Sequence, residues 1–129
     1  MLEKINTNKA PNAIGPYSQA VIDGNMIFTS GQISVDPASG DIVGKTIAEQ
    51  THRVCKNLLA VLEACGGSLN TVIKTVCYLS DMNNFKQFNE VYAEYFTGKP
   101  ARSCVEVARL PKDVLVEIDV IAKKEEVQI

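Results

Sequence analysis

Two alternating apolar runs near the end of the chain constrain the fold more than any other feature. Apolar side chains recur in residues 102–108 and 114–120 in a pattern that predicts two neighbouring β-strands, and Leu110-Pro111-Lys112-Asp113 between them predicts the turn. Arg102 begins the first strand, and Glu117 lies inside the second. A carboxylate within so apolar a strand costs free energy unless it is paired or used.

The spacing of Arg102 and Glu117 allows two interpretations. In the first, they form a structural ion pair, or the charge protects an edge strand from aggregation. In the second, Arg102 binds a substrate carboxylate through its rigid fork of N–H donors, and Glu117 handles a water molecule beside it. Spacing alone does not choose between them.

The composition favours one globular domain over residues 1–129, with 46% hydrophobic residues and a net charge of −2. No apolar run has the length needed to span a bilayer, and no charged and then apolar leader follows Met1. The four cysteines form no Cys-x-x-Cys pair. We therefore expect a cytoplasmic protein with reduced, mostly buried cysteines and no membrane partner.

Three classes of function have little support in the sequence. His52 is the single histidine and has no clustered cysteines near it, so no metal site is expected; a solvent-facing position on a helix is expected instead. Slight acidity and the lack of a clustered Lys/Arg run argue against a nucleic-acid partner. No segment matches the P-loop or dinucleotide-binding patterns.

Hydrophobic periodicity and turn residues predict the element order β-β-β, α, β, α, β-β. The first three strands are expected at residues 3–7, 18–22 and 26–33, the last two of them joined across Asp23-Gly24-Asn25. The fourth strand is expected at residues 72–79, where β-branched residues are frequent.

Both helices carry end signals. Thr46 and Glu49 fit a capping box at the start of the first helix, and Gly66-Gly67 is expected to end it. Asn84, with a glutamine three residues later, resembles the cap of a second helix, which Gly98 is expected to close. The aromatic stripe of this second helix is expected to belong to the core.

This order predicts an α+β fold, a mixed sheet with two helices packed on one face. Two helices cover only one side of the sheet, yet the strands carry apolar residues on both sides, as where Val116 and Ile118 alternate with Leu115 and Ile121. A monomer would expose more contiguous apolar surface than soluble proteins usually tolerate. We therefore expect a ring-shaped oligomer, with Glu117 near a subunit boundary.

Several separated segments resemble the RidA (YjgF) family, in the right order and over nearly the whole chain. They are residues 13–20 (Ala-Ile-Gly-Pro-Tyr-Ser-Gln-Ala), residues 29–32 (Thr-Ser-Gly-Gln), Asn89, Tyr92, residues 100–105 (Pro-Ala-Arg-Ser-Cys-Val), Leu110 and residues 116–118 (Val-Glu-Ile). The resemblance implies a chorismate-mutase-like fold and a homotrimer with three pockets between subunits. It also implies hydrolysis of reactive enamines and imines, such as 2-aminoacrylate and 2-iminobutanoate, to 2-keto acids and ammonia, without a cofactor.

The resemblance implies a role for each candidate site residue. Arg102 is expected to clamp the substrate carboxylate, and Glu117 to orient and deprotonate the attacking water. The substrate pocket is expected to be lined by Tyr17, Ser30, Gly31, Asn89, Arg102 and Cys104. A nucleophilic role for Cys104 is not favoured, because such a cysteine usually needs a histidine base or strongly electropositive surroundings. Segment 97–99 is shorter than in many relatives, so the approach to Arg102 is expected to differ.

Two functions of other classes remain open. One is a non-catalytic module that binds 2-keto acids or a protein partner with the same arginine. The other is ribonuclease activity or translation inhibition, to which relatives have been linked, although the sequence offers neither a histidine pair nor a basic patch for it. Glu117 favours catalysis over simple binding, because a pocket that only binds carboxylates has little use for a second, buried carboxylate.

Overall fold

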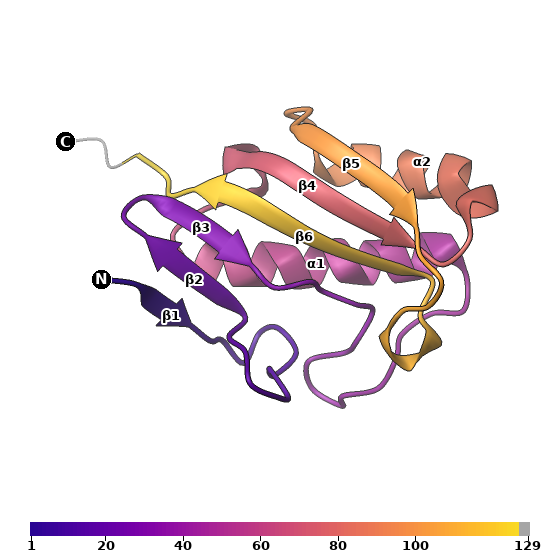
Figure 1. Ribbon diagram of the computed structural model, residues 1–129, viewed down its shortest axis with the longest axis horizontal. Coiled ribbons are helices and arrows are strands. Elements are labelled where there is room, and N and C mark those ends of the chain that lie inside the picture. The colour runs from indigo at the N-terminus through magenta and orange to yellow at the C-terminus, as the bar shows by residue number, and fades with distance from the viewer. Residues whose placement is uncertain (127–129) are drawn as a thin grey trace.

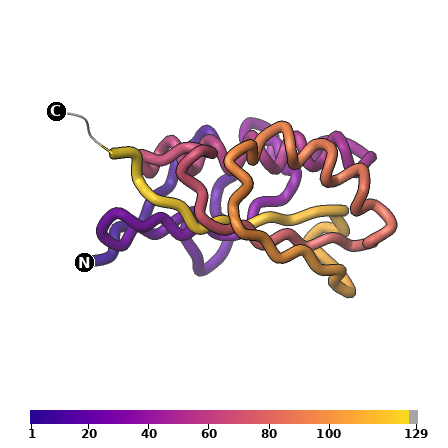
Figure 2. Tube along the Cα trace, turned by 90° about the horizontal axis from the view of Figure 1, so that it is seen from above, coloured from indigo at the N-terminus to yellow at the C-terminus, as the bar shows by residue number. Residues whose placement is uncertain are grey.

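The computed structural model describes residues 1–126, in which six strands form a sheet of order β1-β2-β3-β6-β4-β5. The strands are β1 (Glu3–Ile5), β2 (Ala20–Asp23), β3 (Met26–Thr29), β4 (Val72–Leu79), β5 (Ala101–Glu106) and β6 (Val116–Lys123). Strands β4 and β5 run parallel, and the other neighbouring pairs run antiparallel. The helices α1 (Ile47–Ala64) and α2 (Phe85–Tyr95) both lie on one face of the sheet (Figure 1, and Figure 2 from above). The predicted α+β order is confirmed.

The capping box predicted for α1 is present. The Thr46 hydroxyl accepts a hydrogen bond from the Glu49 amide at 3.2 Å, and the Glu49 carboxylate accepts one from the Thr46 amide at 3.1 Å. Gly66 follows the helix with φ of +82°, the left-handed conformation that glycine adopts at low cost. Neither helix within residues 1–126 has the length and apolar character needed to cross a bilayer.

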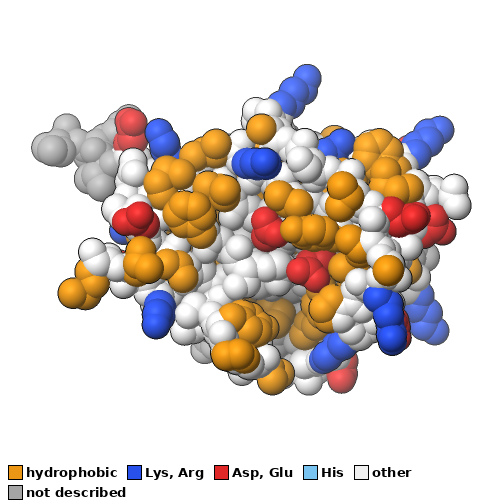
Figure 3. Space-filling view, in the orientation of Figure 1, with side chains coloured by type: hydrophobic (Ala, Val, Ile, Leu, Met, Phe, Trp, Pro, Cys, Tyr) orange, Lys and Arg blue, Asp and Glu red, His pale blue; other side chains and the backbone are white. Residues whose placement is uncertain are grey.

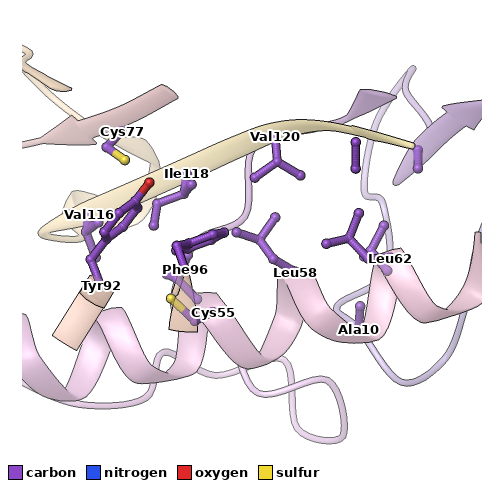
Figure 4. Packing of buried hydrophobic residues seen from close by; sticks show 14 of the residues in the cluster. Ala10, Cys55, Leu58, Leu62, Cys77, Tyr92, Phe96, Val116, Ile118 and Val120 are labelled. Atoms are coloured by element: carbon purple, nitrogen blue, oxygen red, sulfur yellow. The ribbon is translucent and has the colours of Figure 1, made fainter. Parts of the chain in front are cut away.

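The core lies between the helices and the face of the sheet that they cover. Along β6, every second residue points into it, as the strand period of two requires. Figure 4 shows this packing of β6 against helical side chains, which include Leu58 and Leu62 of α1 and Tyr92 of α2. The core side chains of β6 are Val116, Ile118, Val120 and Ala122, each at most 1% exposed.

The opposite side of the sheet, called the open face below, has no covering helix within the described residues. Its side chains include Phe28 of β3 and Val105 of β5, which are 43% and 45% exposed. Figure 3 shows hydrophobic side chains spread over this face with acidic groups among them. Such a face matches the predicted two-sided apolar character of the strands.

The prediction that the last two strands are neighbours is wrong. Strand β4 lies between β5 and β6 and pairs with both. Residues 110–113 therefore do not form a hairpin turn but connect two separated strands, through the short 3-10 helix Pro111–Asp113. Burial alternates along β6 as predicted, whereas β5 is mostly exposed. Alternation within a strand carries no information about which strand lies beside it.

Predicted element ends also need correction. The third strand ends at Thr29 rather than at residue 33. The Ser30 amide still donates to the carbonyl oxygen of Gln19, opposite it on the β2 side, at 2.9 Å, and Gln32 pairs only with Ile118 of β6, as an isolated bridge. Helix α2 ends at Tyr95, well before Gly98, and the left-handed residue beyond it is Lys99, with φ of +53°.

The predicted side-chain cap at Asn84 is absent. Asn84 precedes α2 but has helical backbone angles, and its side chain forms no capping hydrogen bond. A 3-10 helix, Met82–Asn84, comes before α2, and Asp81 caps this segment instead, accepting a hydrogen bond from the Asn83 amide at 2.8 Å. The side-chain cap therefore lies three residues before the predicted one, at the start of the 3-10 helix.

Candidate functional site

Glu117 lies on the open face, against the backbone of Gly31. Gln32 and Ile118 exchange backbone hydrogen bonds of 2.9 and 3.2 Å, which hold residues 30–32 beside β6. A Cβ atom added to Gly31 would overlap Oε2 of Glu117 and lie 2.8 Å from its Cδ. Position 31 must therefore lack a side chain for the carboxylate to occupy this place.

The surroundings of Glu117 disfavour its charge. Burial raises the pKa of this half-buried carboxyl group, and the negative charge of Asp119, two residues away on the same face of β6, raises it further. The pKa of Asp119 is also raised by burial, although a hydrogen bond of 3.3 Å from the Tyr78 hydroxyl opposes this. A carboxylate with a raised pKa accepts a proton more readily, as a general base must.

Tyr17 and Ser30 lie in the loops beside Gly31. Tyr17 is 52% exposed and follows Gly15, whose φ of +131° lets the Tyr17 amide donate to the Gly15 carbonyl oxygen at 2.9 Å. The Ser30 hydroxyl donates to the Ser18 carbonyl oxygen at 2.5 Å. That bond ties the hydroxyl to the loop, so Ser30 has a structural role in addition to its predicted place at the pocket.

A pocket of about 470 Å³ opens beside Gly31. Three loop segments line it, and they contribute Pro11, Asn12, Ile14, Tyr17, Gln19, Gly31, Gln32, Ile33, Val35, Asp36, Pro37, Ala38, Ser39, Gly40, Pro111 and Lys112. Tyr17 and Gly31, both predicted site residues, thus share one cavity. Its size is within the range of small-molecule sites.

Arg102 lies elsewhere, on the edge strand β5. It is aligned with Thr75, a buried residue of β4, so its side chain is on the side of the sheet that the helices cover. Nη1 of Arg102 donates to Oδ1 of Asn89 on α2 at 2.7 Å, and the guanidinium carbon lies 4.8 Å from the centre of the Tyr92 ring. Within residues 1–126, neither of the two salt bridges involves Arg102.

Cys104 is partly buried two residues further along β5, aligned with Cys77 of β4. Burial raises the pKa of its thiol, and the nearby charge of Arg102 only partly opposes that effect. The thiol is therefore protonated at neutral pH, which makes it a poor nucleophile. All four cysteines are free, and Cys55, Cys65 and Cys77 are buried, as expected.

The structure thus divides the predicted site residues into two groups. Tyr17 and Gly31 line the pocket, and Glu117 lies against Gly31 on the open face. Ser30 adjoins Gly31 in the chain, but neither Ser30 nor Glu117 is among the residues that line the pocket. Arg102, Asn89 and Cys104 gather at the other side of the sheet, below α2. The register shows this separation: Glu117 is aligned with Tyr78, whereas Arg102 is aligned with Thr75, and those two residues of β4 point to opposite faces.

Sequence reasoning missed or misplaced several residues. Asp119 was not proposed as part of the site, although its spacing from Glu117 places both on one face. His52 has its predicted exposed position on α1, with 43% of its side chain exposed. Its contacts with α2 were missed: Nδ1 lies 2.8 Å from the Tyr95 hydroxyl, and Nε2 lies 3.8 Å from Oε2 of Glu94. No group of three or more histidine, cysteine or acidic side chains suitable for a metal occurs within the described part of the chain.

Comparison with known proteins places this chain in a family. The family model described as endoribonuclease L-PSP matches residues 7–124. The chain belongs to this family, known also as RidA/YjgF. A RutC family protein of Pyrococcus horikoshii is 59% identical over 126 residues, which cover 97% of this chain and all of the relative. The 2-iminobutanoate/2-iminopropanoate deaminase of Escherichia coli is 47% identical over 95% of this chain and 98% of its own length.

A solved relative extends the comparison to the fold. The Escherichia coli protein TdcF with bound serine superposes with a TM-score of 0.90, at 44% identity, covering 95% of this chain and 99% of that one. The mixed sheet with two helices is therefore the fold of this family.

Proposed function

We propose that this RidA-family protein hydrolyses reactive 2-imino acids, and their 2-enamino tautomers such as 2-aminoacrylate, to 2-keto acids and ammonia. The observation that carries the proposal is the pair of unusual side chains: Arg102 without an acidic partner among the described residues, and Glu117 with a raised pKa beside Gly31. The 47% identity to a 2-iminobutanoate/2-iminopropanoate deaminase supports this substrate class. The proposed reaction uses no metal and no cofactor.

Arg102 would bind the substrate carboxylate through two parallel N–H···O hydrogen bonds. This contact fixes the neighbouring carbon, which is doubly bonded to nitrogen, in one orientation. Glu117 would accept a proton from water as the water oxygen forms a bond to that carbon, giving a tetrahedral carbinolamine. Glu117 passes this proton to nitrogen, which completes the neutral carbinolamine. The hydroxyl proton then also moves to nitrogen through Glu117, so that the C–N bond breaks, ammonia leaves and the C=O bond of the keto acid forms. A 2-enamino substrate first gains a proton on carbon and loses one from nitrogen to become the imine.

A complete site in this proposal needs two subunits. Arg102 and Glu117 point to opposite faces of one sheet, so one chain does not present them to the same small substrate. An assembly that covers the open face would bring Glu117 of one subunit towards Arg102 of another. The exposed apolar side chains of that face, such as Phe28 and Val105, favour a homotrimer of the kind that the resemblance implies.

The test is direct. A serine or threonine dehydratase generates 2-aminoacrylate or 2-iminobutanoate, semicarbazide competes for the intermediate, and keto-acid release is compared with trapped adduct. We expect faster keto-acid release with wild type, loss of this effect with Arg102→Ala, and a decrease of about 100-fold or more with Glu117→Gln. Arg109→Ala is the matched control, because Arg109 is an exposed arginine paired with Asp113. A folded wild type without effect on release would exclude this activity on these substrates.

Binding without turnover is the second candidate. It is favoured by one observation, the serine bound to the related TdcF protein, since serine carries the same α-carboxylate that Arg102 would clamp. Calorimetric titration with 2-oxobutanoate separates the two functions when it is combined with the release assay. Binding by a wild type that does not accelerate release would support this second candidate.

A further inference from the structure

A buried pair of hydroxyl groups links the sheet to α2 directly below Arg102. Thr75 of β4 is fully buried, and its Oγ1 lies 2.8 Å from the hydroxyl oxygen of Tyr92. Figure 4 shows Tyr92 with its oxygen directed at the sheet, close to Cys77 of the same strand. Oγ1 of Thr75 also accepts a weaker contact of 3.8 Å from Sγ of Cys77. A buried hydroxyl is costly without a partner, and the Tyr92 hydroxyl has Thr75 as its hydrogen-bond partner.

The Tyr92 ring is also held from the side. It stacks on Phe96 with a centroid distance of 4.5 Å and an interplanar angle of 27°, and Phe88 lies 5.5 Å away at a tilt of 42°. Any other rotamer of Tyr92 would break this stack and the hydrogen bond between the two hydroxyl groups. The ring therefore has one stable position.

The guanidinium of Arg102 rests on this fixed ring. Its carbon lies 4.8 Å from the Tyr92 centroid and 5.4 Å from the Phe85 centroid, distances typical of cation–π contacts. Asn89 accepts the hydrogen bond from Nη1, which fixes rotation of the guanidinium over the ring. Phe85, Asn89 and Tyr92 of α2 thus fix the position of the guanidinium group. Thr75 of β4 in turn fixes the position of the Tyr92 ring.

We infer that Thr75, Tyr92 and Phe85 are positioning residues that hold the Arg102 guanidinium in place for a substrate carboxylate. The inference rests on the proposed function for the identity of that substrate. A hydroxyl pair is not needed to fill the core, since a phenylalanine and a valine would fill it without polar atoms to satisfy. Bidentate recognition depends on angle as well as distance, so a fixed guanidinium binds a carboxylate more tightly than a mobile one.

The central experiment measures 2-oxobutanoate binding by calorimetry together with KM and kcat for imine hydrolysis. Tyr92→Leu removes the ring under Arg102, and we expect the dissociation constant and KM to rise about tenfold, with a smaller change in kcat. Tyr92→Phe and Thr75→Val remove the hydroxyl pair, and we expect rises of about threefold. Tyr95→Phe and Tyr95→Leu are the matched controls, because they remove another hydroxyl and another ring of α2, which contact His52 and not Arg102.

A double-mutant cycle separates positioning from general damage to the core. Combined with Arg102→Ala, the substitution Tyr92→Leu should cause no further loss of 2-oxobutanoate binding, because the group that it positions is gone. Equal losses with and without Arg102 would overturn the inference, as would losses by the controls as large as those by Tyr92→Phe. Should Tyr92→Leu not fold, the same cycle is run with Tyr92→Phe or Thr75→Val.

The binding measurement also keeps this inference distinct from the proposed function. If 2-oxobutanoate affinity changes as expected in the double-mutant cycle but the wild-type protein hydrolyses no imine, the positioning inference is supported and the hydrolase proposal is rejected. Hydrolysis in a protein whose 2-oxobutanoate affinity and KM do not respond to Tyr92 would support the hydrolase and reject positioning. A wild type that neither binds nor hydrolyses would overturn both.

Discussion

The backbone of Gly31 and the carboxylate of Glu117 occupy adjoining space, so that a single added methyl group at residue 31 would overlap Oε2. We expect Gly31→Ala to push the Glu117 side chain aside and to reduce imine hydrolysis strongly. The loss of folding free energy should be small, because the three atoms nearest to the added methyl group all belong to the flexible Glu117 side chain. Thermal unfolding and keto-acid release measure the two effects. Gly98→Ala is the matched control, because no atom lies within 4 Å of a Cβ added there. Unchanged hydrolysis in a folded Gly31→Ala protein would contradict the role of Glu117.

Burial is the larger cause of the raised pKa of Glu117, and the negative charge of Asp119 is the second cause. A general base works only when ionised, so the rate of hydrolysis should fall as the pH drops through the raised pKa of Glu117. We expect Asp119→Asn to lower that pKa and to move the acid limb of the pH–rate profile to lower pH. Asp23→Asn, at an exposed turn between β2 and β3, should leave the limb in place. An acid limb that moves to higher pH in Asp119→Asn would contradict the claim that the charge of Asp119 raises the pKa of Glu117.

The same raised pKa predicts how stability depends on pH. The folded state disfavours ionised Glu117, so this group favours folding when it is protonated at low pH, and that contribution is lost as the pH rises through its folded-state pKa. We therefore expect Glu117→Gln to raise the melting temperature at pH 7 and to have little effect near pH 4. Calorimetry at both pH values tests this. Destabilisation at pH 7 would mean that the ionised carboxylate has a stabilising partner in the assembled protein.

Cys104 provides a test of covalent catalysis. Burial raises its thiol pKa, and it raises those of Cys65 to about 11 and Cys77 to about 12. We expect iodoacetamide at pH 7.5 to modify Cys104 slowly and the buried cysteines more slowly still, as followed by mass spectrometry. Cys104→Ala should retain kcat within about threefold, because no covalent step through sulfur is proposed. A loss of more than about 1,000-fold with the fold intact would make sulfur part of the chemistry.

Local features of the fold were predictable because they depend on neighbours in sequence. The capping box of Thr46 and Glu49 and the inward alternation of β6 are set by spacings of two to four residues. The pairing of β5 with β4 was not predictable in this way, because strand order is decided by packing of the whole sheet and by the crossover through α2. The short turn at residues 110–113 suggested a hairpin that the sheet does not contain.

The same limit applies to the candidate site. Arg102 and Glu117 stood out in the sequence as charged residues in largely apolar runs, but their positions on opposite faces depend on the register of both strands with β4. Tyr92 was assigned to the core with the other aromatic residues of α2. That assignment is correct for its burial and incomplete for its function, since helical periodicity does not distinguish a ring that fills the core from one that also supports a charge.

The opposite orientation of Arg102 and Glu117 leads to a last prediction, on mixed oligomers. Arg102→Ala and Glu117→Gln chains, each inactive alone, are unfolded, combined in equal amounts and refolded together. If each site takes Arg102 from one subunit and Glu117 from the next, random assembly leaves both intact in about one quarter of the sites, and about that fraction of wild-type hydrolysis should return. Each variant refolded alone is the control, and native mass spectrometry verifies that mixed oligomers formed. Mixed oligomers without activity would show that a site takes both residues from the same chain, against the division of the site by the sheet.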